Sequence, residues 1–476
     1  MLSKKSKNYL AVITTLFSNL LILLTIWLIR KYDNVTIDQF LYQMKSSATG
    51  VDHSLGISAS FWVVLLSILF TYLEVELYLY FKDQNRYRFI IKNIKTCIIT
   101  ILVFALTFFS SKLKLVTYAK TLVNESNFIA EHYVTPTNDI ISFPKEKRNL
   151  IYIYLESMEA SYANYINEDE EVINLIPELT KLAQDNISFS YDLGVGGMQS
   201  FNGTTWTAAS MVSQTSGLTI KTPLFGNQYK GEEYLPGAIT LGDILNEAGY
   251  KQVLLMGSDA NFANRDTYFR NHGNYEILDT NSLKSAGRLD SDYHVWWGFE
   301  DNKLFNYAKE ELLKLSKTDQ PFNFTMLTAD THFPDGYVSI GCEDKYDSQY
   351  ANVIAHSSKQ VYEFVEWIKA QDFYENTTIV ISGDHLTMDP NFFKDVEKDY
   401  KRSVYNAIIN APISPNKTKE RLYGTFDMFP TTLASLNIEI KGDRLALGTN
   451  LFSEEKTLAE IYGVDNLNYE LTNQAF

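Results

Sequence analysis

The sequence predicts an α/β domain with a mostly parallel sheet sandwiched by helices, preceded by an N-terminal region of transmembrane helices. Three long apolar runs occupy much of the first quarter of the chain. Farther along, short runs rich in β-branched and aromatic residues alternate with amphipathic stretches. Buried parallel strands have this composition, and their alternation with helices is typical of a sheet that is covered on both faces.

Length and charge limit the classes of function. The chain has 476 residues, which is too long for one ordinary domain. Its formal net charge of −15 excludes a nucleic-acid partner, because binding nucleic acid needs a basic face. Cys97 lies inside an apolar run and Cys342 lies far beyond it, so we expect no disulfide between them.

The apolar runs predict three membrane spans. Residues 9–29 carry no charge and reach the roughly 20 residues that cross a bilayer. A signal peptide is the alternative, but this run is longer than a typical signal core and no small-residue cleavage site follows it. Residues 61–80 form a second span, although two glutamates interrupt its end, and residues 94–111 form a third. We therefore expect a transmembrane region over residues 1–112.

Basic residues predict the orientation of these spans. One basic cluster precedes the first span and another lies between the second and third, and together they outnumber the two basic residues that follow the first span. We expect both clusters on the cytoplasmic side, which places the chain after Ser111 outside the cytoplasm. The clusters are Lys4, Lys5 and Lys7, and Lys82, Arg86, Arg88, Lys92 and Lys95.

The rest of the chain reads as a linker and one α/β domain. We expect a juxtamembrane helix and linker over residues 113–148, followed by an extracytoplasmic domain over residues 149–476. The expected strands of this domain are "NLIYIYL", "KQVLLM", "FNFTML" and "TTIVIS". Amphipathic stretches between the strands predict helices at residues 171–186, 301–315 and 349–370.

Acids and histidines follow three of these strands. Glu156 follows the first, Asp330 and His332 follow the third, and Asp384 and His385 follow the fourth. One acid after a strand is more often a helix cap than a ligand. Because ligand sites of parallel sheets lie at the carboxyl ends of the strands, however, the three sets should converge. Two carboxylates and a histidine suit a divalent cation such as Mn²⁺, Mg²⁺ or Zn²⁺.

The stretch "QSFNGTTWTAASMVSQTSG" allows two interpretations. In the first, Thr204 or Thr205 caps a helix whose small residues are buried. In the second, Gly203 permits a close backbone approach, and Thr207 at the helix start points its oxygen at the metal and at an anion held by helix amides. A hydroxyl activated in this way becomes a nucleophile.

Seven stretches, in order over most of residues 149–453, are similar to the phosphoglycerol transferase branch of the alkaline phosphatase/sulfatase superfamily. This branch includes the transferases of periplasmic glucans and the lipoteichoic acid synthases, and the chain resembles the glucan type more. The stretches are "NLIYIYLESMEASY", "GTTWTAASMVSQTSG", "MGSDANFANRDTYFRNHG", "WWGFEDNKLF", "LTADTHFPDG", "ENTTIVISGDHLTMDP" and "TFDMFPTTLASLNIEIKGDRLALGTNLF".

The resemblance implies an activity. A membrane-anchored, metal-dependent transferase would move a glycerol phosphate group from phosphatidylglycerol to a cell-envelope glycan through a phosphoglyceryl-threonine intermediate. Thr207 matches the nucleophile, His332 a histidine that contacts substrate and shuttles a proton, and Arg265 an arginine that holds the phosphoglycerol group. One divalent cation is implied, with Mn²⁺ expected and Mg²⁺ or Zn²⁺ as alternatives. Its matching ligands are Glu156, Thr207, Asp384 and His385.

The chain also departs from the lipoteichoic acid synthases. They carry a histidine shortly before the arginine and a tryptophan two positions ahead of it, whereas Met256 and Ala263 stand here. The glycerol pocket is therefore expected to differ in shape. The membrane part is smaller than is usual for the family.

Several alternatives stay open. A phosphoethanolamine transferase or a phosphodiesterase would use the same scaffold, and an envelope sensor would keep the fold without the reaction. A sulfatase is disfavoured, because the chain has no Cys- or Ser-x-Pro-x-Arg motif. His272 and His294 either line an acceptor groove or have structural roles, and Trp296 and Trp297 either stack on a sugar or pack in the core.

Overall fold

The computed structural model of the protein describes residues 4–32, 35–45, 53–84, 87–121, 126–167, 170–192, 194–222, 233–393 and 401–473. Arg86, part of the predicted basic cluster, lies outside these residues. The chain forms two compact units. A helical unit contains residues 1–40 and 51–123, and an α/β unit contains residues 41–50 and 124–476.

The helical unit contains the three predicted apolar segments. In the described part of the chain, three helical stretches are long and apolar enough to cross a membrane: Tyr9–Lys31, Gly56–Asp83 and Ile94–Lys112. They include α1 (Lys4–Lys31), α3 (His53–Ala59), a π-helical turn η1 (Ser60–Leu65), α4 (Leu66–Asp83) and α6 (Ile94–Lys112). Shorter helices are α5 (Arg88–Lys92) and α7 (Leu115–Thr121), and α2 (Ile37–Lys45) runs across the boundary between the units.

A polar contact joins two of these apolar helices. Asn19 of α1 donates a hydrogen bond to Glu74 of α4 at 3.0 Å and another to Thr71 at 3.1 Å. The carboxylate in the second apolar run is thus paired with an amide, as polar groups in apolar helices usually are.

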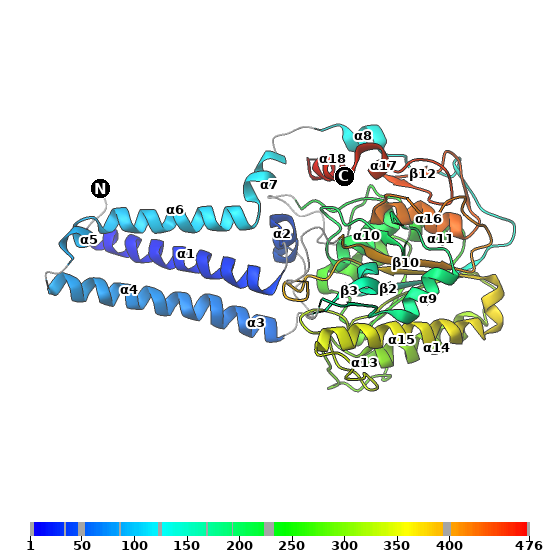
Figure 1. Ribbon diagram of the computed structural model, residues 1–476, viewed down its shortest axis with the longest axis horizontal. Helices are drawn as coiled ribbons and strands as arrows, with labels where there is room; N and C mark the ends of the chain where they lie inside the picture. Colours follow the sequence, from blue (N-terminus) through cyan, green and yellow to red (C-terminus); the bar gives the residue numbers. More distant parts are fainter. Residues whose placement is uncertain are drawn as a thin grey trace. The chain divides into compact units, whose positions relative to one another are not determined.

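A seven-stranded sheet forms the centre of the α/β unit (Figure 1). Its order is β5-β10-β9-β2-β8-β6-β7, and the five strands from β9 to β7 are parallel. β10 runs antiparallel to β9, and β5 runs antiparallel to β10. The bounds are β2 (Asn149–Leu155), β5 (Gly197–Met198), β6 (Lys251–Met256), β7 (Glu276–Leu278), β8 (Phe322–Leu327), β9 (Thr377–Gly383) and β10 (Val404–Ile409). The four predicted strands are therefore neighbours, β9, β2, β8 and β6, and the predicted fold class is confirmed.

Both faces of the sheet are buried, which explains why the strands read as continuous apolar runs. In β2 the even-numbered residues 150, 152 and 154 join one core, and the odd-numbered residues 151, 153 and 155 join the other. Helices α9 (Pro177–Asp185), α14 (Asp301–Leu315) and α15 (Gln349–Lys369) contribute to the second core. The first core receives α10 (Thr207–Ser216), α11 (Leu241–Glu247), α12 (Arg265–Asn271) and α16 (Met428–Ser435), and Figure 1 shows α10, α11 and α16 across the sheet from α9 and α15.

The predicted helices are present in the structure, with differences at some of their ends. α14 has the predicted bounds, and α15 ends one residue early. The helix predicted over residues 171–186 begins only at Pro177, because Val172–Ile173 forms a strand, β4, paired with β3 (Tyr165–Ile166). Proline lacks an N–H and suits the first turn of a helix, which explains where α9 starts.

The remaining elements are short. They are α8 (Phe128–His132), β1 (Ile141–Ser142), α13 (Thr280–Ser285), β11 (Glu439–Ile440), β12 (Arg444–Leu445), β13 (Gly448–Thr449), α17 (Leu458–Tyr462), α18 (Val464–Asn473) and four 3-10 turns, η2 (Ala160–Asn164), η3 (Phe262–Asn264), η4 (Asp372–Asn376) and η5 (Thr425–Asp427). β1 pairs with β11, so part of the segment expected as a linker joins the α/β unit. The boundaries proposed at residues 112 and 148 stay predictions.

Candidate active site

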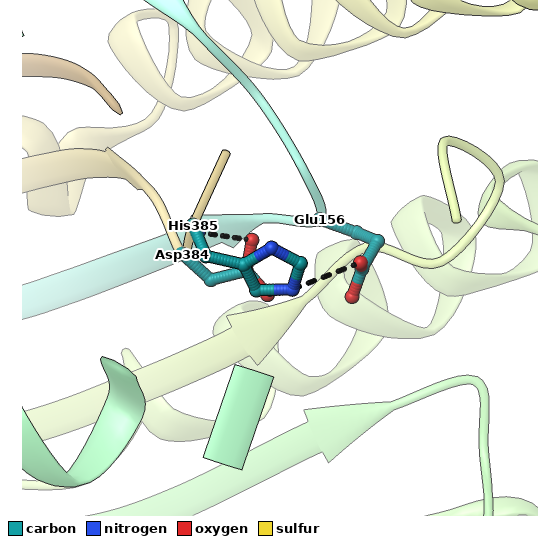
Figure 2. Close-up of side chains that lie close together, drawn as sticks. All are labelled: Glu156, Asp384 and His385. Atoms are coloured by element: carbon teal, nitrogen blue, oxygen red, sulfur yellow. Dashed lines mark hydrogen bonds and ion pairs between the residues drawn. The ribbon is translucent and has the colours of Figure 1, made fainter. Parts of the chain in front are cut away.

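Two acids meet at the carboxyl edge of the sheet because their strands are neighbours in register. Leu155, the last residue of β2, lies opposite Gly383, the last residue of β9. Glu156 and Asp384 follow directly, and His385 comes next. Figure 2 shows the three buried side chains together, and one ligand atom from each lies within 4.8 Å of the others. Among the described residues this is the group of acids and histidines that could hold a metal ion.

The imidazole of His385 is oriented for a ligand role. Its Nδ1 donates a hydrogen bond to the carbonyl of Leu386 at 2.7 Å. Its Nε2 lies 3.5 Å from Glu156 Oε1 and 3.5 Å from Asp384 Oδ2. Ligating histidines usually donate their second N–H to a carbonyl or a carboxylate, since this bond selects the tautomer with a lone pair on the ligating nitrogen.

Ser157 forms hydrogen bonds to both acids. It was not predicted as a site residue from the sequence. Its backbone N–H donates to Asp384 Oδ1 at 2.7 Å, and its hydroxyl donates to Glu156 Oε1 at 2.8 Å. The left-handed backbone of Ser157, with φ 51°, is uncommon for a residue other than glycine. Its position directly after the first acid was the available signal, but a serine after a strand is too common to single out.

The two acids carry like charges, which repel each other when both are ionised. Burial raises the pKa of Asp384 to about 7, and the charge of Glu156 adds to this effect. Burial also acts to raise the pKa of Glu156, but the charges of His332 and His385, together with hydrogen bonds from Ser157 and Thr207, oppose burial, and the pKa is lowered. Asp384 Oδ2 is buried and makes no hydrogen bond. A carboxylate pair with an imidazole between them fits a divalent cation, which binds the deprotonated forms.

Thr207 faces this group from the start of α10. Its hydroxyl donates to Glu156 Oε2 at 3.1 Å and lies 3.4 Å from His385 Nε2. The predicted threonine cap is wrong, because the N-cap is Trp206, which makes no side-chain capping bond. The burial predicted for the small residues of this helix is confirmed. Thr204 instead closes a turn, because its hydroxyl bonds the backbone N–H and carbonyl of Phe201. No side chain among the described residues therefore caps the first amides of α10.

Two residues anchor α10 beside the acids. Gly203, with φ 81°, approaches Ile220 so closely that a Cβ would lie 2.3 Å from its carbonyl oxygen. The close approach predicted at Gly203 is thus between its backbone and the backbone of Ile220. Gln214 donates to the carbonyl of Gly383 and accepts a hydrogen bond from Tyr152. This glutamine joins α10 to the end of β9, one residue before Asp384.

His332 follows β8 and lies close enough to Glu156 and Arg265 for their charges to act on it. Its Nδ1 donates to the carbonyl of Phe333 at 2.6 Å, which leaves the lone pair on Nε2. Burial lowers the pKa of His332, although the charge of Glu156 opposes this effect. Trp297 packs on the imidazole with ring centroids 4.6 Å apart, so this half-buried tryptophan lies beside a candidate site residue.

Arg265 is the first residue of α12, beyond β6. It is 6% exposed, and its guanidinium is held by groups of its own loop. Nη2 donates to Ser258 Oγ and to the carbonyl of Asp259, and Nε donates to the carbonyl of Phe262. Nη1 makes no hydrogen bond within the described part of the chain, so its two N–H groups remain to bind an anion.

Asp330 does not join the metal-type group, although it also follows a strand. It pairs with Asp301: the backbone N–H of Asp301 donates to Asp330 Oδ1 at 3.1 Å. In return, Asp301 accepts the N–H groups of Ala329 and Asp330 at 2.8 and 3.1 Å. The pair holds the loop that carries His332, so Asp301 has a structural role.

The other two candidate histidines, His272 and His294, are not members of this group. His272 is buried, with Nδ1 2.9 Å from Asp243 Oδ2 and Nε2 2.6 Å from the carbonyl of Tyr234. These bonds are structural. His294 is exposed in a loop.

The α/β unit shares its fold with solved structures of other proteins. The structure is similar to a protein of the alkaline phosphatase superfamily from Vibrio parahaemolyticus, with a TM-score of 0.53 and 21% identity over 71% of this chain and 81% of that chain. The sulfatase family matches residues 148–438. The chain belongs to the sulfatase family.

Curated relatives are similar in sequence over the same region. Phosphoglycerol transferase I of Shigella flexneri is 32% identical over 341 residues, which are 70% of this chain and 42% of the relative. The Escherichia coli protein of the same name is 31% identical over 341 residues. The chain thus spans about two fifths of the length of the curated relatives that it matches.

Two further solved structures share the fold. Lipoteichoic acid synthase LtaP from Listeria monocytogenes has a TM-score of 0.50 and 20% identity, over 68% of this chain and 80% of that chain. Lipooligosaccharide phosphoethanolamine transferase A from Neisseria meningitidis, an integral membrane protein, has a TM-score of 0.51 and 14% identity. That match covers 90% of this chain and 83% of the other.

Proposed function

We propose that the protein is a membrane-anchored transferase that moves a glycerol phosphate group from phosphatidylglycerol to a hydroxyl of a cell-envelope glycan. One observation carries the proposal: the hydroxyl of Thr207 lies 3.1 Å from Glu156, beside the buried carboxylate and imidazole group, at an uncapped helix start. The sequence similarity to proteins named phosphoglycerol transferase I supports the choice of transferred group.

Glu156, Asp384 and His385, with the hydroxyl of Thr207, would hold one divalent cation. Their donor set of oxygens and one imidazole suits Mn²⁺, with Mg²⁺ and Zn²⁺ as alternatives. When bound, such a cation lowers the pKa of a hydroxyl and offsets the charge on phosphoryl oxygens.

Thr207 acts as the nucleophile. Its Oγ forms a bond to the phosphorus of phosphatidylglycerol while the bond from phosphorus to the diacylglycerol oxygen breaks. The proton of the threonine hydroxyl ends on the released diacylglycerol. In the second half, the acceptor hydroxyl forms the new bond to phosphorus, the bond to Thr207 breaks, and the proton of the acceptor returns to the threonine. Because the transfer occurs in two steps, the diacylglycerol can leave before the acceptor hydroxyl enters the same site.

His332 and Arg265 handle the proton and the charge. The Nε2 lone pair of His332 suits a proton shuttle, because Nδ1 is engaged with a backbone carbonyl and burial lowers the pKa of the imidazole. The Nη1 of Arg265 would donate to the phosphoryl oxygens, and the uncapped amides of α10 would face the same group.

The three apolar helices would anchor the enzyme in the cytoplasmic membrane, with the α/β unit outside the cytoplasm beside its lipid donor. A reporter that is active only outside the cytoplasm, fused after Phe476, tests this topology. Signal from a cytoplasmic reporter alone at the same position would contradict both the orientation and the access to the donor.

The function is tested by trapping the intermediate. Full-length protein in vesicles of phosphatidylglycerol is digested, and its peptides are analysed by mass. We expect a glycerol phosphate adduct on Thr207, absent from Thr207→Ala and kept in Thr204→Ala, whose hydroxyl only closes a turn. An adduct on Thr204, Thr205 or Ser210 would show that the nucleophile is wrong. Vesicles of phosphatidylethanolamine are the control for donor class, and transfer from them would indicate a phosphoethanolamine transferase.

A further inference from the structure

We propose that Tyr42 is a positioning residue of the active site. Its hydroxyl binds and positions the loop before Arg265, and its ring packs against Trp206, the residue before Thr207. The inference rests on the proposed function, because it takes Arg265 as the residue that binds the phosphoglycerol group.

Tyr42 comes from an unexpected part of the chain. It lies in α2, between the first and second apolar segments of the sequence, yet residues 41–50 belong to the α/β unit. Its side chain is 0% exposed and is part of the first core of that unit. A phenol in such a place needs hydrogen-bond partners, because a buried polar group without one is costly.

Two described residues are partners of the Tyr42 hydroxyl, and their roles are defined. The hydroxyl lies 2.7 Å from the carbonyl of Ala263 and 3.0 Å from the hydroxyl of Tyr234. A carbonyl can only accept, so Tyr42 gives its single hydrogen to Ala263. Tyr234 must therefore donate to Tyr42.

Ala263 is a residue whose backbone needs support. Ala263 has φ 58° and ψ 22°, and the next residue, Asn264, has φ 56° and ψ 31°. Two consecutive left-handed residues other than glycine are unfavourable and persist only when their surroundings hold them. The bond from Tyr42 to the carbonyl of Ala263 is such a support, placed two residues before Arg265.

The conformation of this loop sets the direction of the guanidinium. Arg265 donates to the carbonyls of Asp259 and Phe262, which belong to the loop that Ala263 continues. A shift of the Ala263 peptide would move these acceptors and with them the unbonded Nη1. Tyr42 thus acts on the substrate through Arg265.

The ring of Tyr42 also contacts the other half of the site. Its centroid lies 5.3 Å from that of Trp206, at an angle of 49°. Trp206 is the N-cap of α10 and directly precedes Thr207. One side chain therefore touches both the segment of the proposed nucleophile and the segment of the proposed substrate arginine.

Tyr234 is itself held in place. Its carbonyl accepts a hydrogen bond from His272, and its backbone N–H donates to Asn271 Oδ1 at 2.8 Å. His272 and Asn271 stand at the end of α12, the helix that begins with Arg265. The network runs from Tyr42 through Tyr234 back to the arginine helix, so it can transmit the position of Tyr42 to that helix.

Tyr42→Phe removes the hydroxyl and keeps the ring. We expect kcat/KM for phosphatidylglycerol to fall about tenfold, the scale of one buried hydrogen bond. The loss should appear in KM, because Arg265 holds the phosphoglycerol group in both the ground state and the transition state. Full-length enzyme is assayed in phosphatidylcholine vesicles with increasing fractions of phosphatidylglycerol.

Tyr405→Phe is the matched control. Tyr405 is buried in the same unit, and its hydroxyl donates to the carbonyl of Leu179 at 2.7 Å in the opposite core. Both variants lose one hydroxyl bonded to a backbone carbonyl, so their melting temperatures should fall by similar amounts. Only Tyr42→Phe should raise KM. Equal KM values in the two variants would overturn the positioning role.

A double variant separates this inference from the proposed function. Arg265→Lys should raise KM by itself, and adding Tyr42→Phe should cost little more, because both changes act through one guanidinium. Additive effects would overturn the inference and leave the proposed function intact. An unchanged KM in Arg265→Lys would instead contradict the role of the arginine, and the inference would fall with it.

Discussion

Two pairs of buried acids lie at the same edge of the sheet, Glu156 with Asp384 and Asp301 with Asp330, and they differ in their neighbours. Burial raises the pKa of Asp384 and of Asp330 to about 7 in each case. Each of these aspartates also has an oxygen, Oδ2, that makes no hydrogen bond. Neither a shifted pKa nor an unbonded oxygen therefore distinguishes the two pairs.

The distinction lies in the groups that face the acids. Asp301 accepts hydrogen bonds from the backbone N–H groups of Ala329 and Asp330, so its pair stabilises the loop after β8. Glu156 and Asp384 are faced by the imidazole of His385 and, at Glu156, by the hydroxyl of Thr207. Backbone amides satisfy a carboxylate permanently, whereas an imidazole and a hydroxyl can also bind a cation or move a proton. The comparison teaches that the partners of a buried acid indicate its role better than its burial does.

The largest expected effect is the loss of the hydroxyl beside the first pair. Thr207→Ala should reduce turnover of phosphatidylglycerol at least about a thousandfold, the scale for deletion of a nucleophile. The melting temperature should change little, because the hydroxyl donates a single hydrogen bond, to Glu156. Thr207→Ser should retain part of the activity. Full turnover by Thr207→Ala would show that the hydroxyl beside Glu156 and Asp384 is not the nucleophile.

The next effect concerns the cation. Full-length protein should contain about one divalent ion per chain by elemental analysis, and Glu156→Gln and His385→Ala should each lose it while the protein stays folded. Strand-end positions tolerate such changes, because the sheet itself is unaltered. Asp301→Asn is the control and should keep the ion. Unchanged metal content in both site variants would rule out the first pair as the metal site.

A smaller effect is expected at the second pair. Asp301→Ala leaves two buried N–H groups without acceptors, each worth about 1–3 kcal/mol, so the free energy of unfolding should fall by roughly 3 kcal/mol. Thermal unfolding in detergent measures the loss, and metal content should stay unchanged. Loss of the ion with normal stability would mean that Asp301 belongs to the metal site.

The smallest expected effect concerns Ser157, which supports both acids of the first pair, Glu156 and Asp384. Ser157→Ala removes the hydroxyl bonded to Glu156 but keeps the backbone N–H bonded to Asp384. Losing one hydrogen bond of about 1 kcal/mol should weaken cation binding roughly fivefold. Titration of the metal-free protein with Mn²⁺ measures this change. Affinity equal to that of the unaltered protein would show that Ser157 supports the fold alone.

The sequence predicted the strands well because both faces of the sheet are buried. Such strands need apolar residues at every position, so β2, β6, β8 and β9 stand out as short continuous runs. Helix starts were less predictable. Proline begins α9 six residues after the predicted start, and α10 has no hydroxyl cap although two threonines precede it. Residues that could cap a helix also close turns, as Thr204 does.

By itself, the sequence determined which acids and histidines follow strands, and therefore which of them reach the carboxyl edge of the sheet. It could not decide which acids meet. Asp384 comes beside Glu156 because β9 and β2 are neighbours in register, and Asp330 turns to Asp301 instead. The same holds for Tyr42, whose partner Ala263 lies 221 residues farther along the chain. Strand order and long-range packing bring such groups together, and neither leaves a local pattern in the sequence, because local patterns report burial and not the identity of the neighbour.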